Sequence, residues 1–126
     1  SDLVLNNYAY FLSLEGRDLE RALAMAGRAI VLEENNPTYL DTYAWVLYRL
    51  GRYDEAKKTM QQALSLDRSQ SPDLQLHYGD ILAALGEKFM AEVYWKKALE
   101  GGYDDPDAIV ERFRRLKEAA QTPAAP

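Results

Sequence analysis

Apolar and small residues recur along this chain with the spacing expected of paired helices. Between Pro37 and Leu66 the apolar positions follow helical spacing on both sides of Gly51, which predicts two helices joined by a turn. A near copy of this segment lies on each side of it, displaced by 34 or 35 residues. Self-similarity at this period is typical of a helical repeat array.

The repeat is clearest at its small residues. Gly16 recurs as Gly51 and Gly86, and the position of Ala44 is held by Ala9 before it and Gly79 after it. Further alanines recur in the second helix of each copy: Ala22, Ala56 and Ala91, and Ala29, Ala63 and Ala98. Because the distance between two packed helices depends on the side chains at their contact, we expect these positions to mark close helix crossings.

Capping residues followed by proline mark the starts of later helices. The pairs are Asn36-Pro37, Ser71-Pro72 and Asp105-Pro106. We expect Asp2 to cap a first helix over about 3–14, and a second helix over about 19–32. The predicted organisation is one domain over 1–120, with repeats at about 3–36, 37–71 and 72–105, a final helix at 106–120, and a disordered tail at 121–126.

The final helix is expected to close the array, because Arg114 replaces the small residue of the earlier copies. Its inward-facing residues are expected to be Ile109, Val110, Phe113 and Leu116. Its basic residues are Arg112, Arg114, Arg115 and Lys117. They form either the solvated face of a capping helix or a site for an acidic partner.

The chain resembles the tetratricopeptide repeat (TPR) family over Leu3 to about Gly101. The matching positions of the central copy are Leu40, Tyr43, Ala44, Leu47, Gly51, Tyr53, Ala56, Met60, Ala63 and Leu64. The family's Trp position holds Leu5, Leu40 and Gln75 instead. The resemblance implies an all-α fold, an α-α superhelix (TPR solenoid) of three helical hairpins plus a C-terminal capping helix. The segment 41–51 looks like the last repeats of long bacterial TPR proteins, so we expect the chain to be the C-terminal piece of a larger one.

Composition excludes several classes of function. The net charge of −5 argues against nonspecific nucleic-acid binding, which needs clustered Lys and Arg. The absence of Cys excludes disulfides and thiolate chemistry. No apolar run approaches the roughly 20 residues that span a bilayer, so no membrane insertion is expected. The compartment stays open between cytoplasm and periplasm, since a signal peptide would belong to the parent protein.

The chain offers no constellation for catalysis. His77 is the only histidine, and it precedes Asp80 by three residues. A catalytic triad needs a nucleophile beside the base, and a metal site needs three or four ligands. The repeat places no serine and no acidic cluster beside His77 that would complete a triad or a metal site. The sequence also contains no glycine-rich phosphate loop. We therefore predict that the chain is not an enzyme and holds no cofactor or metal.

Candidate binding residues follow from the family's concave face, which the first helices of the repeats line. Carried over by position, they form a row of Asn6, Asp41 and Leu76, a second row of Tyr10, Trp45 and Asp80, and the neighbours Tyr48 and Arg49. Trp, Tyr and Arg are enriched at binding hot spots. Trp45 belongs either to this groove or to the core. Asp41 would favour a ligand that carries a basic group.

These observations predict a noncatalytic scaffold that binds a protein or peptide through the concave face of the repeats. The alternative is a structural spacer or capping portion of a longer array, with no ligand of its own. The two differ in whether the groove exposes aromatic side chains. We also expect weak self-association through the first helix, whose outer face no preceding repeat covers.

Overall fold

Seven α-helices make up the part of the chain that the computed structural model describes, residues 1–121. They are α1 (Asp2–Glu15), α2 (Leu19–Leu32), α3 (Pro37–Arg49), α4 (Tyr53–Leu66), α5 (Pro72–Ala84), α6 (Lys88–Glu100) and α7 (Pro106–Gln121). No strand occurs in these residues, so the predicted all-α class is confirmed. The expected tail lies outside them except for Gln121, which ends α7.

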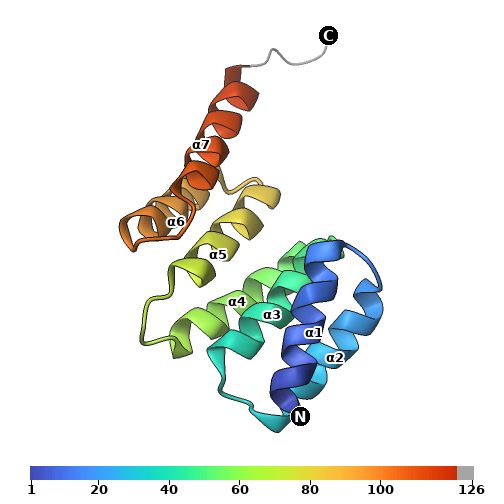
Figure 1. Cartoon of the computed structure of the whole chain (residues 1–126). Coiled ribbons are helices and arrows are strands. Elements are labelled where there is room, and N and C mark those ends of the chain that lie inside the picture. The colour runs from blue at the N-terminus through green and yellow to red at the C-terminus, as the bar shows by residue number, and fades with distance from the viewer. Residues whose placement is uncertain (122–126) are drawn as a thin grey trace.

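The helices form three antiparallel pairs and one single helix (Figure 1). The helices α1, α3 and α5 each pack on the even-numbered helix that follows, and α7 packs on α6. The odd-numbered helices α1, α3 and α5 also contact one another in order, while α2 packs on α3 and α4 on α5. In Figure 1 the pairs succeed one another from α1 and α2 at one end to α7 at the other. The result is a stack in which α1, α3 and α5 form one layer.

The repeating glycines close the turn inside each pair. Gly16, Gly51 and Gly86 all have positive φ angles, of 69°, 81° and 81°. Glycine adopts this left-handed conformation without the steric cost that a Cβ atom would bring. The first turn carries one residue more than the others, and it takes Asp18 into the left-handed region at φ 50°. Glycine therefore recurs at this position in all three copies because each turn requires a positive φ angle.

Two of the expected helix caps differ in detail: Asp2 is displaced by one residue, and Ser71 stands at the N-cap of α5 without a side-chain capping hydrogen bond. The Asn36 side chain accepts hydrogen bonds from the backbone N–H groups of Thr38 and Tyr39, as a cap should. Ser1, and not Asp2, caps α1, because its side chain accepts from the N–H of Val4. Asp2 instead lies in the first turn and accepts a 2.7 Å hydrogen bond from the Tyr39 hydroxyl. This bond ties the start of α1 to α3.

A small residue and a large one face each other in the third pair. A Cβ atom added to Gly79 would lie 2.4 Å from Cδ1 of Trp95, far inside van der Waals contact. Trp95 is buried, and its indole N–H donates a 2.9 Å hydrogen bond to Asp80. The ring is therefore held in place over Gly79. The sequence predicts a close crossing here, and the structure shows that it admits no side chain at all.

The last helix docks on α6 through a single stripe. Ile109 is fully buried, and Phe113 meets the Trp95 ring edge to face with 5.7 Å between centroids. Val110, expected to face inward, is 57% exposed. The reason is that α7 contacts only one helix backbone, so only residues spaced by three or four, such as Ile109 and Phe113, reach the core.

Candidate functional site on the inner layer

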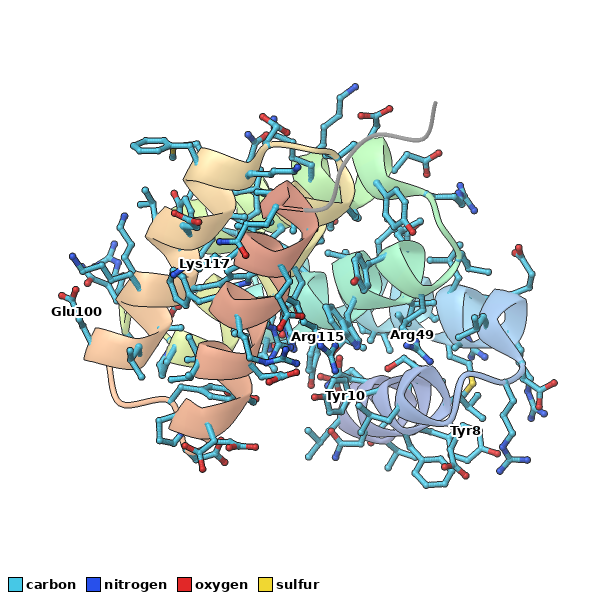
Figure 2. The ribbon with its side chains drawn as sticks, turned by 90° about the horizontal axis from the view of Figure 1, so that it is seen from above. Tyr8, Tyr10, Arg49, Glu100, Arg115 and Lys117 are labelled. Carbon is cyan, nitrogen blue, oxygen red and sulfur yellow. The ribbon has the colours of Figure 1, made fainter. Side chains whose placement is uncertain are left out.

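Side chains from α1, α3 and α5 meet on the inner layer, the face that these three helices share. Figure 2 views this region from above and shows Tyr10 of α1 and Arg115 of α7 pointing toward the same central space. Tyr8, also on α1, points away from it. The period of 35 residues places the equivalent positions of the three helices next to one another. The site is therefore a product of the repeat.

Three rings form a stacked row in the middle of this face. The rings of Trp45 and Tyr48 lie 4.6 Å apart between centroids with an interplanar angle of 18°. Trp45 also stacks on the imidazole of His77, at 4.2 Å between centroids and 26° between planes. Trp45 and Tyr48 are half-buried, and His77 is buried. The open question about Trp45 thus has a mixed answer, because one part of the ring packs inside and another part reaches solvent.

A buried ion pair fixes the end of the row. His77 Nδ1 donates to Asp41 Oδ1 over 2.8 Å, joining α5 to α3. Burial is the largest single influence and disfavours the charged imidazolium, but the charge and hydrogen bond of Asp41, together with the charges of Asp80 and Asp73, outweigh it, so the pKa of His77 is raised. The sequence predicts His77 as a partly exposed polar residue that is hydrogen-bonded to a neighbouring helix; the hydrogen bond is present, but the side chain is buried. What this prediction misses is the contact between α3 and α5 that brings Asp41 and Trp45 to this ring.

Asp80 is fully engaged by two other helices. Arg112 of α7 holds both of its carboxylate oxygens, with distances of 2.7 Å from Nε to Oδ1 and 2.9 Å from Nη2 to Oδ2. The indole of Trp95 donates to Oδ1 as well. The bond to Asp80 raises the pKa of Arg112 further. Asp80 therefore ties α5, α6 and α7 together, and its charge is already compensated.

Two cavities open on the inner layer, one on each side of the aromatic row. The first, of about 360 Å³, is called here the acidic cavity. Its main lining residues are Asn6 and Tyr10 from α1, Asp41 from α3, Asp73 and His77 from α5, and Asp104 from the loop before α7. The second, of about 550 Å³, lies against α7 between Tyr48, Asp80, Glu111 and the two arginines 112 and 115. The aromatic row thus lies between the acidic cavity and a second cavity that is lined by both acidic and basic side chains.

The remaining candidate residues fall into different environments. Leu76 is 2% exposed and packs in the core, so its side chain does not reach the surface. The reason is that its row, with Asn6 and Asp41, faces the neighbouring inner helices and is buried throughout. Tyr10 is half-buried, and burial together with the charge of Asp41 raises its pKa. Arg49 is exposed and its guanidinium lies beside Gly16, at the turn between α1 and α2.

Several lining residues were not predicted. Asp73 lies in the first turn of α5, and Tyr103 and Asp104 belong to the loop after α6. A rule that carries over only mid-helix positions of the first helices cannot find them. Within residues 1–121, no group of three or more His, Asp or Glu side chains is arranged to hold a metal ion. In the same residues no helix has the length and apolarity to cross a membrane.

Comparison with known proteins identifies the architecture. Residues 37–69 match the family model of the tetratricopeptide repeat. The first TPR of Spaghetti (RPAP3), bound to the HSP90 peptide SRMEEVD, superposes with a TM-score of 0.80 at 19% identity, covering 96% of this chain and 94% of that one. The Yersinia enterocolitica type III secretion translocator chaperone SycD gives 0.78 at 18%, with 96% and 95% covered. The Sgt2 TPR domain from Aspergillus fumigatus gives 0.79 at 18%, with 99% and 85% covered.

Proposed function

Because this chain contains a tetratricopeptide repeat and has the fold of tetratricopeptide repeat domains, we propose that it is a noncatalytic scaffold that binds a peptide segment of a protein partner. The proposed site is the inner layer, along the aromatic row of Tyr48, Trp45 and His77. The observation that carries the proposal is that Tyr48 and Trp45 are half-exposed and yet held by stacking on each other and, for Trp45, on the buried His77.

Rigid, partly exposed aromatic rings favour binding for two reasons. Large flat side chains bring much contact area, and Trp and Tyr are enriched among the residues that dominate binding energies. Rings that are already stacked lose little rotamer freedom when a ligand covers them. Trp45 stacks on two rings, Tyr48 and His77, so the part of it that reaches solvent is preorganised.

The shape of the inner layer favours an elongated ligand. The acidic cavity and the cavity against α7 lie on opposite sides of the row, and Tyr48 and His77 each line one of them. A peptide that crosses the row would place side chains in both. The structurally similar first TPR of Spaghetti (RPAP3) is bound to a peptide, SRMEEVD, which supports peptide binding by this fold.

A second candidate function is that of a terminal spacer in a longer array. It is favoured by the exposed apolar side chains of α1, among them Leu3, Val4, Phe11 and Leu14. A preceding helical pair would cover them, as α2 and α3 together cover the inner side of α1. A spacer could fold with the same aromatic row and bind nothing there, so only a binding experiment separates the two functions.

The test is selection from a phage-displayed library of random dodecapeptides on the immobilised chain. Selected peptides are then measured against Tyr48→Ala and against Tyr94→Ala, a control that truncates a half-buried tyrosine on α6, away from the row. We expect Tyr48→Ala to weaken binding about tenfold, the effect of a hot-spot residue. Equal loss in both variants, or no selected peptide at all, would favour the spacer. Circular dichroism confirms that each variant is folded.

A further inference from the structure

The acidic cavity has an unbalanced charge. Asp41, Asp73 and Asp104 line it, and no Lys or Arg does so among residues 1–121. Asp73 and Asp104 form no ion pair within those residues, and the hydrogen bond of Asp41 to His77 engages only Oδ1. The carboxylates also act on their surroundings, because the charges of Asp41, Asp73 and Asp104 contribute to raising the pKa of Tyr10. The cavity therefore favours a positively charged occupant.

One residue that lines the cavity carries a buried acceptor without a donor. Asn6 lines the cavity, is 4% exposed, and its Oδ1 atom accepts no hydrogen bond. Its Nδ2 donates only a long bond of 3.4 Å to Asn7. An unsatisfied buried acceptor costs the free energy of its lost hydration, so such groups call for an explanation. A ligand that brings N–H donors into the cavity would explain this acceptor, because it would supply the missing hydrogen bond.

The other acid of the inner layer does not share this property. Asp80 is compensated by Arg112 and by the indole of Trp95. The basic ligand that sequence analysis associates with the acidic residues of the groove therefore has its place on the α1 side of the aromatic row. There it would meet acidic side chains from two helices and one loop.

We propose that the acidic cavity receives the side chain of a lysine or arginine from the peptide that the scaffold binds, an inference that rests on the proposed function. The ammonium or guanidinium group lies among Asp41, Asp73 and Asp104 and donates to Asn6 Oδ1. The preceding or following residue of the peptide lies on the aromatic row, because His77 both lines the cavity and stacks on Trp45. An acidic side chain is excluded by repulsion.

The direct test uses capped penta-lysine, and as a control the same peptide with every ε-amine acetylated. Binding to the 15N-labelled chain is followed by NMR in 150 mM salt, which screens distant charges. We expect penta-lysine, and not its acetylated form, to shift the signals of the Asn6 side-chain amide and of the Thr42, Asp73 and Tyr103 backbone. Shifts spread over the whole acidic surface of the chain would overturn the proposal.

Matched charge variants sharpen this test. Asp73→Asn removes one carboxylate from the cavity, while Asp54→Asn removes an exposed carboxylate from the first turn of α4, outside it. Both change the net charge equally. We expect Asp73→Asn to weaken penta-lysine binding about threefold to fivefold and Asp54→Asn less than about twofold. Equal effects would show nonspecific attraction and would overturn the proposal.

Asn6→Leu tests the unsatisfied acceptor. The replacement has a similar shape and needs no hydrogen bond, so we expect the midpoint of thermal unfolding to rise while penta-lysine binding weakens. A fall in the midpoint together with unchanged binding would assign Asn6 a structural role and contradict its part in the site.

The peptide library separates this inference from the proposed function. Selected peptides that depend on Tyr48 and carry a lysine or arginine that citrulline or norleucine cannot replace support both. Peptides that depend on Tyr48 but contain no basic residue leave the scaffold function standing and overturn this inference. If no peptide depends on Tyr48, both fall.

Discussion

His77 is the residue at which charge, packing and the candidate site meet. It stacks on Trp45, bonds to Asp41 on the neighbouring inner helix and lines the acidic cavity. Histidine is also the side chain whose unperturbed pKa lies close to neutral pH. The titration of His77 should therefore be visible in the stability of the whole fold.

Burial lowers the folded-state pKa of His77, but the carboxylates of Asp41, Asp80 and Asp73 together outweigh it, so the pKa is raised. A raised pKa means that the folded state binds the proton more tightly than the unfolded state. The resulting stabilisation is complete below the unfolded pKa of about 6.5 and is lost as the pH rises through the folded value. We predict that the free energy of unfolding falls above pH 6.5 in the wild type, and that His77→Gln removes this fall.

The measurement is urea denaturation of both proteins at pH 5.5 and pH 8.5. The change in the free energy of unfolding between the two pH values is compared for the two proteins, so the contributions of titrating groups that both proteins share cancel. If the wild type and His77→Gln lose stability in parallel between the two pH values, then His77 does not carry the linkage.

At this scale the sequence predicts residue types better than their environments. Trp45, Tyr48 and Tyr10 lie on the inner layer as the period places them, while Leu76, on the same reasoning, is buried. The period shows which residues are equivalent, but the exposure of a side chain depends on how neighbouring helices pack. Asn6, Asp41 and Leu76 all face a neighbouring helix and are therefore buried. The ion pair of Asp80 was out of reach too, because the earlier copies hold Asn7, Thr42 and His77 at the position of Arg112, and none of these predicts a cation there.

Between elements, the contact of α5 with α6 depends on one complementary pair. Gly79 and Trp95 occupy positions that hold Ala44 and Met60 in the preceding pair of helices. The Trp95 ring cannot move aside from Gly79, because its N–H is bonded to Asp80. A methyl group at position 79 must therefore displace a buried ring.

We predict that Gly79→Ala destabilises the protein by about 1–3 kcal/mol, the cost of overpacking, in spite of the better helix propensity of alanine. In a Trp95→Met background, which reproduces the preceding pair, the same change should instead stabilise by about 1 kcal/mol. Guanidinium denaturation of the four proteins of this cycle measures both values. A Gly79→Ala effect of the same sign in both backgrounds would contradict the steric explanation.

The seventh helix offers a second comparison between elements. Arg112 is half-buried against Asp80, whereas Arg114 is an exposed residue that pairs with Glu111 and Glu118. Arg112→Gln leaves a buried carboxylate without its cation, so we expect a loss of about 2–4 kcal/mol. Arg114→Gln should change stability much less, because exposed ion pairs contribute little.

Both variants remove one positive charge from α7, so they form a matched pair. Chemical denaturation gives the stabilities, and amide hydrogen exchange in α7 shows whether the loss is local. Should the two substitutions prove equally mild, Arg112 does not fasten α7 to α5. The same experiment would then also exclude Asp80 as the junction of three helices.

On the scale of the whole molecule, the two ends of the stack differ. The C-terminal end is closed by α7, with Ile109 buried beneath it. The N-terminal end leaves Leu3, Val4, Phe11 and Leu14 of α1 exposed, with Tyr8 beside them. Contiguous apolar surface of this kind favours association. The sequence predicts the closed end, since Arg114 takes the position that a small residue holds in the earlier copies.

We predict weak, concentration-dependent self-association through α1. Phe11 is 47% exposed, so Phe11→Lys should suppress association without unfolding the chain. Phe89→Lys, on the exposed side of α6, serves as a control for a lysine added at another exposed phenylalanine. Sedimentation velocity over a wide concentration range is the measurement. A strict monomer at the highest concentration, or equal suppression by both variants, would count against the α1 contact.

The pairing of Gly79 with Trp95 also sets the unit in which this array can be duplicated or recombined. If α6 were put in the place of α4, the indole of Trp95 would face Ala44. The Cβ atom of Ala44 would clash with that ring, so single helices are not interchangeable. A whole pair of helices carries its own small residue and its own large one, and it can be moved together. Junctions at Asn36-Pro37 and Ser71-Pro72 should therefore tolerate insertion or exchange of units, whereas junctions at Gly51 or Gly86 should not.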